Sequence, residues 1–233
     1  HPHVDILEYP VLERYGNKDR QSELNFTPRE YTHPLEYWLE EKGYHHTYAC
    51  NKIYKRHLFD HIEFPKDRTF EDVWTTPLLI GLVHKTEDNI TCQQEKSRDY
   101  EYPIIRMTNV GKYIYHWNNQ GITANAKYED LYQLYAGYSQ SLRAIMNQIE
   151  IQEELIQKYN VQLQDFILQI LNVLLDLYEL SGKYEDNPPI IHYVEKLGKV
   201  VKIKDFKLRL LNLLGYHNLC RLNRIIHRMY RHR

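Results

Sequence analysis

The sequence predicts an α+β fold, with a mixed α/β segment over residues 1–127 followed by a helical bundle over residues 128–233. Two observations lead to this prediction. Alternating apolar and polar runs, which are typical of half-buried strands, occur at residues 4–9 and 110–117. From Tyr128 onward, apolar residues recur at three- and four-residue spacing, which is typical of amphipathic helices.

Three short helices are expected among the first 127 residues. One follows Thr32, a suitable N-cap, and a second covers residues 51–59. A third opens at Glu71 and Asp72, because acidic residues in the first turn complement the helix dipole. The polar stretch at residues 87–99 is expected to form a loop.

The second part of the chain is predicted to be helical throughout. Helical periodicity covers residues 144–159 and 163–180, and Gly182 marks the end of the second helix. A turn is expected at Pro188 and Pro189, and two shorter basic helices should follow it.

The net charge of −1 hides an uneven distribution of charge. Residues 196–233 contain 11 Lys and Arg residues but only one acid, whereas the other 195 residues contain 19 basic and 30 acidic side chains. Such a basic tail is typical of contact with a polyanion or an anionic membrane surface. Three dispersed cysteines without CxxC spacing indicate a reducing compartment and unreactive thiols.

The most informative part of the sequence is a series of three blocks. The first block is ACNKIYKRHLF at residues 49–59, and the second combines Phe64-Pro65 with Phe70-Glu71-Asp72. A third block combines YIYHWN at residues 113–118 with GITA at residues 121–124. In this order the blocks resemble the acceptor-side half of bacterial inverting glycosyltransferases of family 2 type, which have the GT-A fold.

This resemblance implies an enzyme that transfers a sugar from a nucleotide-sugar to a hydroxyl of a polysaccharide or lipid-linked acceptor. Inverting transfer needs a general base that deprotonates the attacking hydroxyl, and a carboxylate can serve. By resemblance Asp72 is this base, and its neighbour Glu71 orients the acceptor or tunes the base. The alternative is that both acids only stabilise the start of a helix.

The resemblance assigns four further residues to contacts with the acceptor or the diphosphate. Asn51 and Lys52 either brace the catalytic helix or touch the acceptor, and the alternative for Asn51 is a helix cap. His116 and Asn118 lie where related enzymes place a residue that reaches the metal-bound diphosphate. The alternative for these two is a polar strand edge.

The donor-binding half of the family is missing from this sequence. No two aspartates are separated by one residue, so the Asp-x-Asp pair that would hold Mg²⁺ or Mn²⁺ is expected only in a full-length parent. We therefore expect this part alone to bind no metal and to be inactive. The pairs His57/His61 and His45/His46 are interpreted as surface histidines, not metal ligands.

The apolar residues within the basic tail allow two interpretations. They either lie in a membrane interface or pack against the preceding helices. We expect a cytoplasmic protein, and the first interpretation would place it at the inner face of the membrane. A non-catalytic helical interaction module is the main alternative to an enzyme, and no motif supports a specific nucleic-acid partner. An uncovered sheet edge would also favour dimers.

Overall fold

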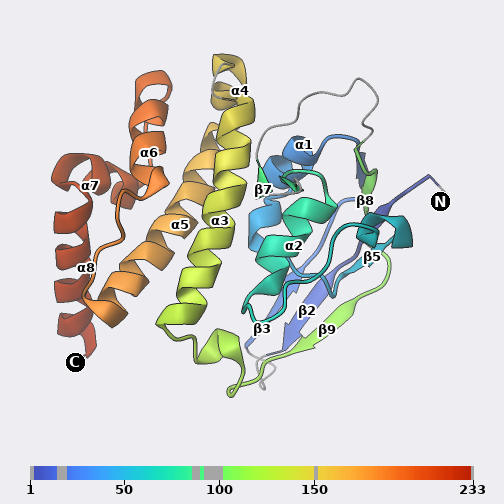
Figure 1. The fold of residues 1–233 in the computed structure, drawn as a ribbon, viewed down its shortest axis with the longest axis horizontal. Coiled ribbons are helices and arrows are strands. Elements are labelled where there is room, and N and C mark those ends of the chain that lie inside the picture. Colours follow the sequence, from blue (N-terminus) through green and yellow to red (C-terminus); the bar gives the residue numbers. More distant parts are fainter. Residues whose placement is uncertain (1–2, 15–19, 86–89, 92–101, 150–151, 232–233) are drawn as a thin grey trace. The chain divides into compact units, whose positions relative to one another are not determined.

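The computed structural model describes residues 3–14, 20–85, 90–91, 102–149 and 152–231. Over these residues the chain is a mixed α/β protein, as the α+β prediction requires. It folds as two compact units, His1–Ala126 and Lys127–Arg233. The described strands all belong to the N-terminal unit, whereas the C-terminal unit consists of helices and their connections (Figure 1).

The N-terminal unit contains short strands and two short α-helices. Its strands are β1 (Ile6–Glu8), β2 (Val11–Arg14), β3 (Gln21–Leu24), β4 (Arg29–Tyr31), β5 (Lys52–Tyr54), β6 (His84–Lys85), β7 (Ile90–Thr91), β8 (Ile105–Met107) and β9 (Tyr113–His116). Its helices are α1 (Pro34–Glu40) and α2 (Glu71–Leu79), with 3₁₀ helices at Gly43–His45, Arg56–Phe59 and Ile122–Ala124. The strands form one sheet of order β4-β8-β1-β5, one of order β3-β2-β9, and the pair β6-β7.

Strand β1 lies inside the four-stranded sheet, parallel to β8 and antiparallel to β5. Because side chains alternate along a strand, Ile6 and Glu8 face the same side, and both are fully buried. Ile6 packs into an apolar core that includes Tyr37 and Trp38 of α1. A carboxylate on the core face of the same strand needs buried partners, and these partners shape the candidate site.

The structure confirms some of the predicted elements and corrects others. The strands expected at residues 4–9 and 110–117 correspond to β1 and β9, and α2 begins at Glu71 as expected. The helix expected over residues 51–59 is wrong, because the segment forms β5 and a 3₁₀ helix. Most of the loop expected at residues 87–99 lies outside the described residues.

The start of α1 also differs from the prediction in its capping residue. The cap is His33, whose Nδ1 accepts a hydrogen bond from the Leu35 amide at 3.3 Å, and not Thr32. Pro34 follows in the first turn, where the missing amide proton removes no helical hydrogen bond.

Over its described residues, the C-terminal unit is a bundle of six helices. They are α3 (Tyr128–Ile149), α4 (Glu153–Lys158), α5 (Asn160–Ser181), α6 (Pro189–Val200), α7 (Phe206–Leu214) and α8 (Tyr216–Arg231). Helices α3 and α5 run side by side and bury Leu142, Ile145, Ile170 and Leu174 (Figure 1). The helix predicted over residues 144–159 is in fact the end of α3 followed by α4.

Glycines mark two of the helix ends in this bundle. Gly182 ends α5 in the left-handed conformation (φ 70°), as the sequence predicts. Three helices follow the proline turn, not the expected two, because Gly215 (φ 74°) separates α7 from α8. A residue with a side chain would be strained at that φ, so the glycine permits the break.

Candidate active site

A buried polar cluster joins β1 to the segment that precedes β5. We call it the Glu8 cluster, and it consists of Glu8, Tyr37, His46, Asn51 and Lys52. Glu8 Oε1 lies 2.8 Å from Lys52 Nζ, 2.8 Å from His46 Nδ1 and 3.1 Å from Asn51 Nδ2. The Tyr37 hydroxyl donates to Glu8 Oε2 at 2.6 Å. The carboxylate is therefore bonded through both oxygens in a site without solvent.

The charge of Glu8 is stabilised by this arrangement. Burial by itself would raise the pKa of the carboxyl, but the interactions with Lys52 and His46 outweigh it and lower the pKa from 4.5 to about 2. His46 also lies 2.8 Å, through Nε2, from the carbonyl oxygen of Glu41, so both of its ring nitrogens face oxygen acceptors. The prediction that His46 is a surface residue is wrong, whereas His45 is exposed as expected.

Lys52 connects the Glu8 cluster to the backbone by hydrogen bonds. Its Nζ donates hydrogen bonds to the carbonyl oxygens of His46 (2.8 Å) and Tyr48 (2.7 Å), and also to Asn51 Oδ1 (3.0 Å). Asn51 Nδ2 in turn donates to the Tyr9 carbonyl oxygen at 3.1 Å. Both Asn51 and Lys52 are buried, which leaves them no surface for an acceptor and gives them a bracing position instead.

The segment braced by Lys52 is bonded to helix α2 at two points. The Ala49 amide donates to Asp72 Oδ2 at 3.2 Å, and Thr76 Oγ1 donates to the Thr47 carbonyl oxygen at 2.7 Å. A continuous series of contacts therefore runs from Glu8 through Lys52 and the backbone of residues 46–49 to Asp72. The sequence predicted a role for Asp72 but gave no sign of this support.

Asp72 lies in the first turn of α2 and is half-buried. Desolvation raises the pKa of its carboxyl above 3.8, the bond from Ala49 opposes this, and the charge of Glu71 adds to it. Among the described residues, no hydrogen bond is recorded to the other oxygen, Oδ1. Glu71, one position earlier, is exposed.

The turn before α2 has an unusual backbone. Phe70 adopts φ 55° and ψ 42°, a left-handed conformation that is rare for a bulky residue. Arg68, two residues earlier, stacks over the ring of Trp74 with its guanidinium carbon 4.2 Å from the ring centroid. Strained backbone of this kind persists only where the surroundings hold it, and it is common beside functional groups.

Cys50 lies near Asp72, and Tyr113 contacts Cys50; neither was predicted as a site residue. Partial desolvation and the Asp72 carboxylate raise the pKa of the Cys50 thiol, which also hydrogen-bonds to Tyr113. The Tyr9 hydroxyl donates to the Cys50 carbonyl oxygen at 2.9 Å. Tyr113 is the first residue of β9, and its pKa is raised chiefly by Cys50. The sequence could have indicated Cys50 only through its position next to Asn51.

The structure does not bring His116 and Asn118 into this group. Both are exposed, and no contact with Asp72 is recorded for either among the described residues. His116 is three residues beyond Tyr113 along β9, or about 10 Å at the usual rise of a strand. Asn118 Oδ1 accepts a hydrogen bond from the Gln120 amide at 2.9 Å and so stabilises a turn.

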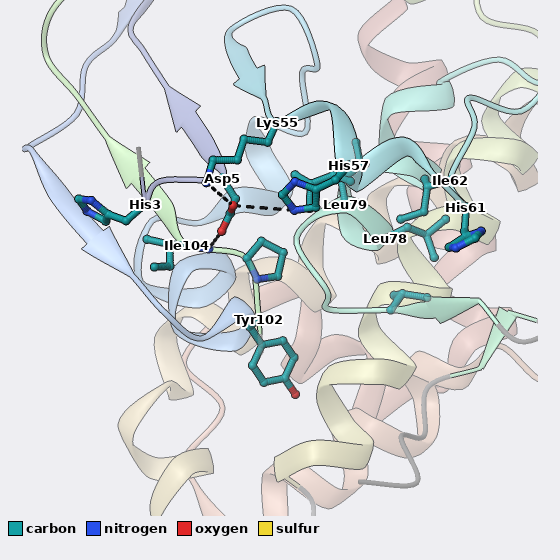
Figure 2. Close-up of a pocket in the computed structure, with 13 residues that line it drawn as sticks. His3, Asp5, Lys55, His57, His61, Ile62, Leu78, Leu79, Tyr102 and Ile104 are labelled. Atoms are coloured by element: carbon teal, nitrogen blue, oxygen red, sulfur yellow. Dashed lines mark hydrogen bonds and ion pairs between the residues drawn. The ribbon is translucent and has the colours of Figure 1, made fainter. Parts of the chain in front are cut away.

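A pocket lies near the start of β1, at the opposite end of this strand from Glu8. This pocket of about 710 Å³ is lined by residues that include Asp5, Lys55, His57, His61 and Tyr102 (Figure 2). Asp5 Oδ1 lies 3.0 Å from Lys55 Nζ and 3.9 Å from His57 Nε2. His57 and His61 are exposed, as the sequence predicts.

In the described part of the chain, no group of three or more His, Cys, Asp or Glu side chains could hold a metal ion. The residues at hand therefore do not fit the Mg²⁺ or Mn²⁺ that the resemblance implies for a full-length parent. No described helix has the length and apolar character needed to cross a membrane. No protein-family model matches this chain, and a search of curated proteins gives no significant match either.

Proposed function

We propose that this chain is the acceptor-side part of an inverting glycosyltransferase and that Asp72 is its general base. One observation carries the proposal: the Ala49 amide donates to one oxygen of the half-buried Asp72 carboxylate, while the other oxygen makes no hydrogen bond recorded within the described part of the chain. A base needs both fixed orientation and an oxygen free to accept the acceptor proton.

The electrostatics of Asp72 suit this role. Burial raises the pKa of the Asp72 carboxyl, and a carboxylate with a raised pKa is a stronger base. In the proposed step, Asp72 Oδ1 takes the proton of an acceptor hydroxyl while the oxygen of that hydroxyl forms its bond to the anomeric carbon of the donor sugar. The bond from this carbon to the nucleoside diphosphate breaks, and its electron pair leaves with the diphosphate.

The remaining predicted residues have different parts in the proposal. Asn51 and Lys52 are positioning residues that act on Asp72 through the backbone of residues 46–49. Glu71 is exposed next to the base and is available to orient the acceptor. A diphosphate contact by His116 or Asn118 stays a prediction. The nucleotide-sugar and any divalent metal would bind to a region upstream of His1, and such an enzyme would work in the cytoplasm.

The test uses the full-length protein that contains this chain, with sugar transfer measured from nucleotide-sugar to acceptor at fixed Mn²⁺. Asp72→Asn should lower the transfer rate about 10²-fold or more while nucleotide binding and folding are retained. Glu71→Gln, the matched change one residue away, should lower it less than about tenfold. Unchanged transfer by Asp72→Asn would rule out the base and favour the alternative, a non-catalytic module.

A further inference from the structure

Helix α8 has two apolar faces, but only one of them is covered. Tyr216, Leu219, Cys220 and Asn223 are buried where α8 packs on α5 and α7 (Figure 1). The second face consists of Leu222, Ile225, Ile226 and Met229, which we call the outer stripe. Their spacing of three, four and seven residues aligns them on one side of the helix.

Three residues of the outer stripe face solvent, and the fourth, Leu222, is half-buried. Ile225 is 56% exposed, Ile226 is 41% exposed and Met229 is 66% exposed. The basic tail is therefore divided: some of its apolar residues, including Leu208, Leu211 and Leu219, pack in the bundle, whereas the outer stripe does not. Scattered exposed apolar residues are ordinary, but an aligned group on one helix indicates a surface that binds something.

The charged residues of the two helices that form this part of the tail are all basic. The stretch from Phe206 to Arg231 contains six Lys and Arg residues and no Asp or Glu. Arg221 and Arg228 lie four residues before and three residues after Ile225, so they follow one edge of the outer stripe. Arg228 is exposed, with no contact recorded among the described residues.

Helix α7 repeats this combination on a smaller scale. Phe206 and Leu213, seven residues apart, are both exposed. Arg209 lies between them, with its guanidinium carbon 6.0 Å from the centroid of the Phe206 ring. Exposed apolar side chains next to arginines therefore occur on both helices of the tail, and neither helix carries an acid of its own. The acid recorded against α8 is Glu179 of α5, which lies 2.5 Å from His227.

We propose that the outer stripe of α8 lies in the headgroup region of an anionic lipid membrane, with Arg228 at the lipid phosphates. An amphipathic helix with Lys or Arg beside a strongly apolar face is the usual form of such an anchor. A nucleic acid would account for the arginines but not for four aligned aliphatic residues. A protein partner would account for the aliphatic residues but would not require a stretch without acids.

This binding is peripheral and does not depend on the proposed transferase activity. The test is the partition of the whole chain onto vesicles, measured by flotation. Vesicles of phosphatidylcholine with phosphatidylglycerol are compared with vesicles of phosphatidylcholine alone. The wild-type chain should bind the anionic vesicles preferentially, and added salt should weaken the binding.

Two variants separate the apolar and the electrostatic contributions. Ile225→Ser with Met229→Ser should weaken the partition at least about tenfold, because two apolar side chains no longer enter the lipid. Arg228→Gln should weaken it about fivefold, the usual effect of one basic residue near an anionic leaflet. The controls are Val161→Ser on α5, where Val161 is 57% exposed, and Lys66→Gln in the N-terminal unit. Both controls should bind like the wild type.

Three results would overturn the proposal. The first is equal binding to both kinds of vesicle, or none. The second is a Ile225→Ser, Met229→Ser chain that floats like the wild type. The third is a chain that does not bind vesicles but self-associates or binds generic RNA, and loses this association when Ile225 and Met229 are replaced. Self-association would identify a second copy as the occupant of the outer stripe, and RNA binding would identify a nucleic acid.

Discussion

Lys52 and Lys55 lie three residues apart and each faces a carboxylate at a similar distance, yet their surroundings differ. Lys52 Nζ is 2.8 Å from Glu8 Oε1 with both side chains 0% exposed. Lys55 Nζ is 3.0 Å from Asp5 Oδ1, but the Lys55 side chain is 38% exposed. Replacing each lysine by methionine keeps most of the stem and removes the charge, so the pair of variants isolates the effect of burial.

We expect Lys52→Met to lower the free energy of unfolding by about 3–5 kcal/mol, because it leaves a buried carboxylate without its main counter-charge. The change also removes the hydrogen bonds to two carbonyl oxygens and one amide oxygen. Lys55→Met should lower it by less than about 1 kcal/mol, since solvent screens the pair that it breaks.

Urea-induced unfolding at neutral pH, followed by tryptophan fluorescence, measures this difference. All three tryptophans, at positions 38, 74 and 117, belong to the N-terminal unit, so the signal reports on the unit that contains both lysines. Equal destabilisation by the two changes, within about 1 kcal/mol, would refute the conclusion that Lys52 stabilises the fold because its ion pair with Glu8 is buried.

Three further predictions follow from burial and pKa. Tyr37→Phe removes the hydroxyl that donates to Glu8, and should lower the unfolding free energy by about 1.5–3 kcal/mol in the same urea assay. The lowered pKa of Glu8 stabilises the fold fully above its unfolded value of 4.5, and this contribution of up to about 3 kcal/mol is lost as the pH falls towards 2. The loss on acidification should therefore be smaller in Glu8→Gln, and equal slopes in an acid titration of stability would contradict this. Ile170→Ala should destabilise the helical bundle by about 2–5 kcal/mol in urea unfolding followed by circular dichroism, whereas the exposed Val161→Ala should change it by less than about 1 kcal/mol.

The sequence predicts the elements that depend on local signals. The start of α2 follows from adjacent acids at Glu71 and Asp72, and the end of α5 follows from Gly182, which adopts the expected left-handed conformation. Both signals lie within a few residues of the feature they specify. The long periodic stretch that became α5 was predicted for the same reason.

The errors arise where distant residues decide the structure. Residues 52–54 form a strand because they pair with β1, more than 40 residues earlier, and no local pattern indicates this ladder. His46 is buried because its two ring nitrogens lie within hydrogen-bond distance of the Glu8 carboxylate and the Glu41 carbonyl oxygen, whereas an isolated histidine in a polar sequence is usually exposed. In the same way, buried Glu and Lys residues are rare enough that the Glu8–Lys52 pair could not be predicted from sequence.

The candidate site could be predicted only in part. The motif indicated Asp72, Asn51 and Lys52, and the structure links all three through hydrogen bonds and a short backbone segment. Cys50 and Tyr113 were missed because the contacts of Cys50 with Asp72 and with Tyr113 depend on the meeting of separate elements. The exposed positions of His116 and Asn118 depend on where β9 ends and a turn begins.

The most direct test of the account is the pH dependence of sugar transfer by the full-length protein. If Asp72 is the general base, kcat/KM should fall on the acid side with an apparent pKa above 3.8, the ordinary value for this carboxyl, because burial raises it. That acid limb should be absent from the residual activity of Asp72→Asn. An acid limb of the same pKa in both proteins would show that another group titrates, and would contradict the central claim.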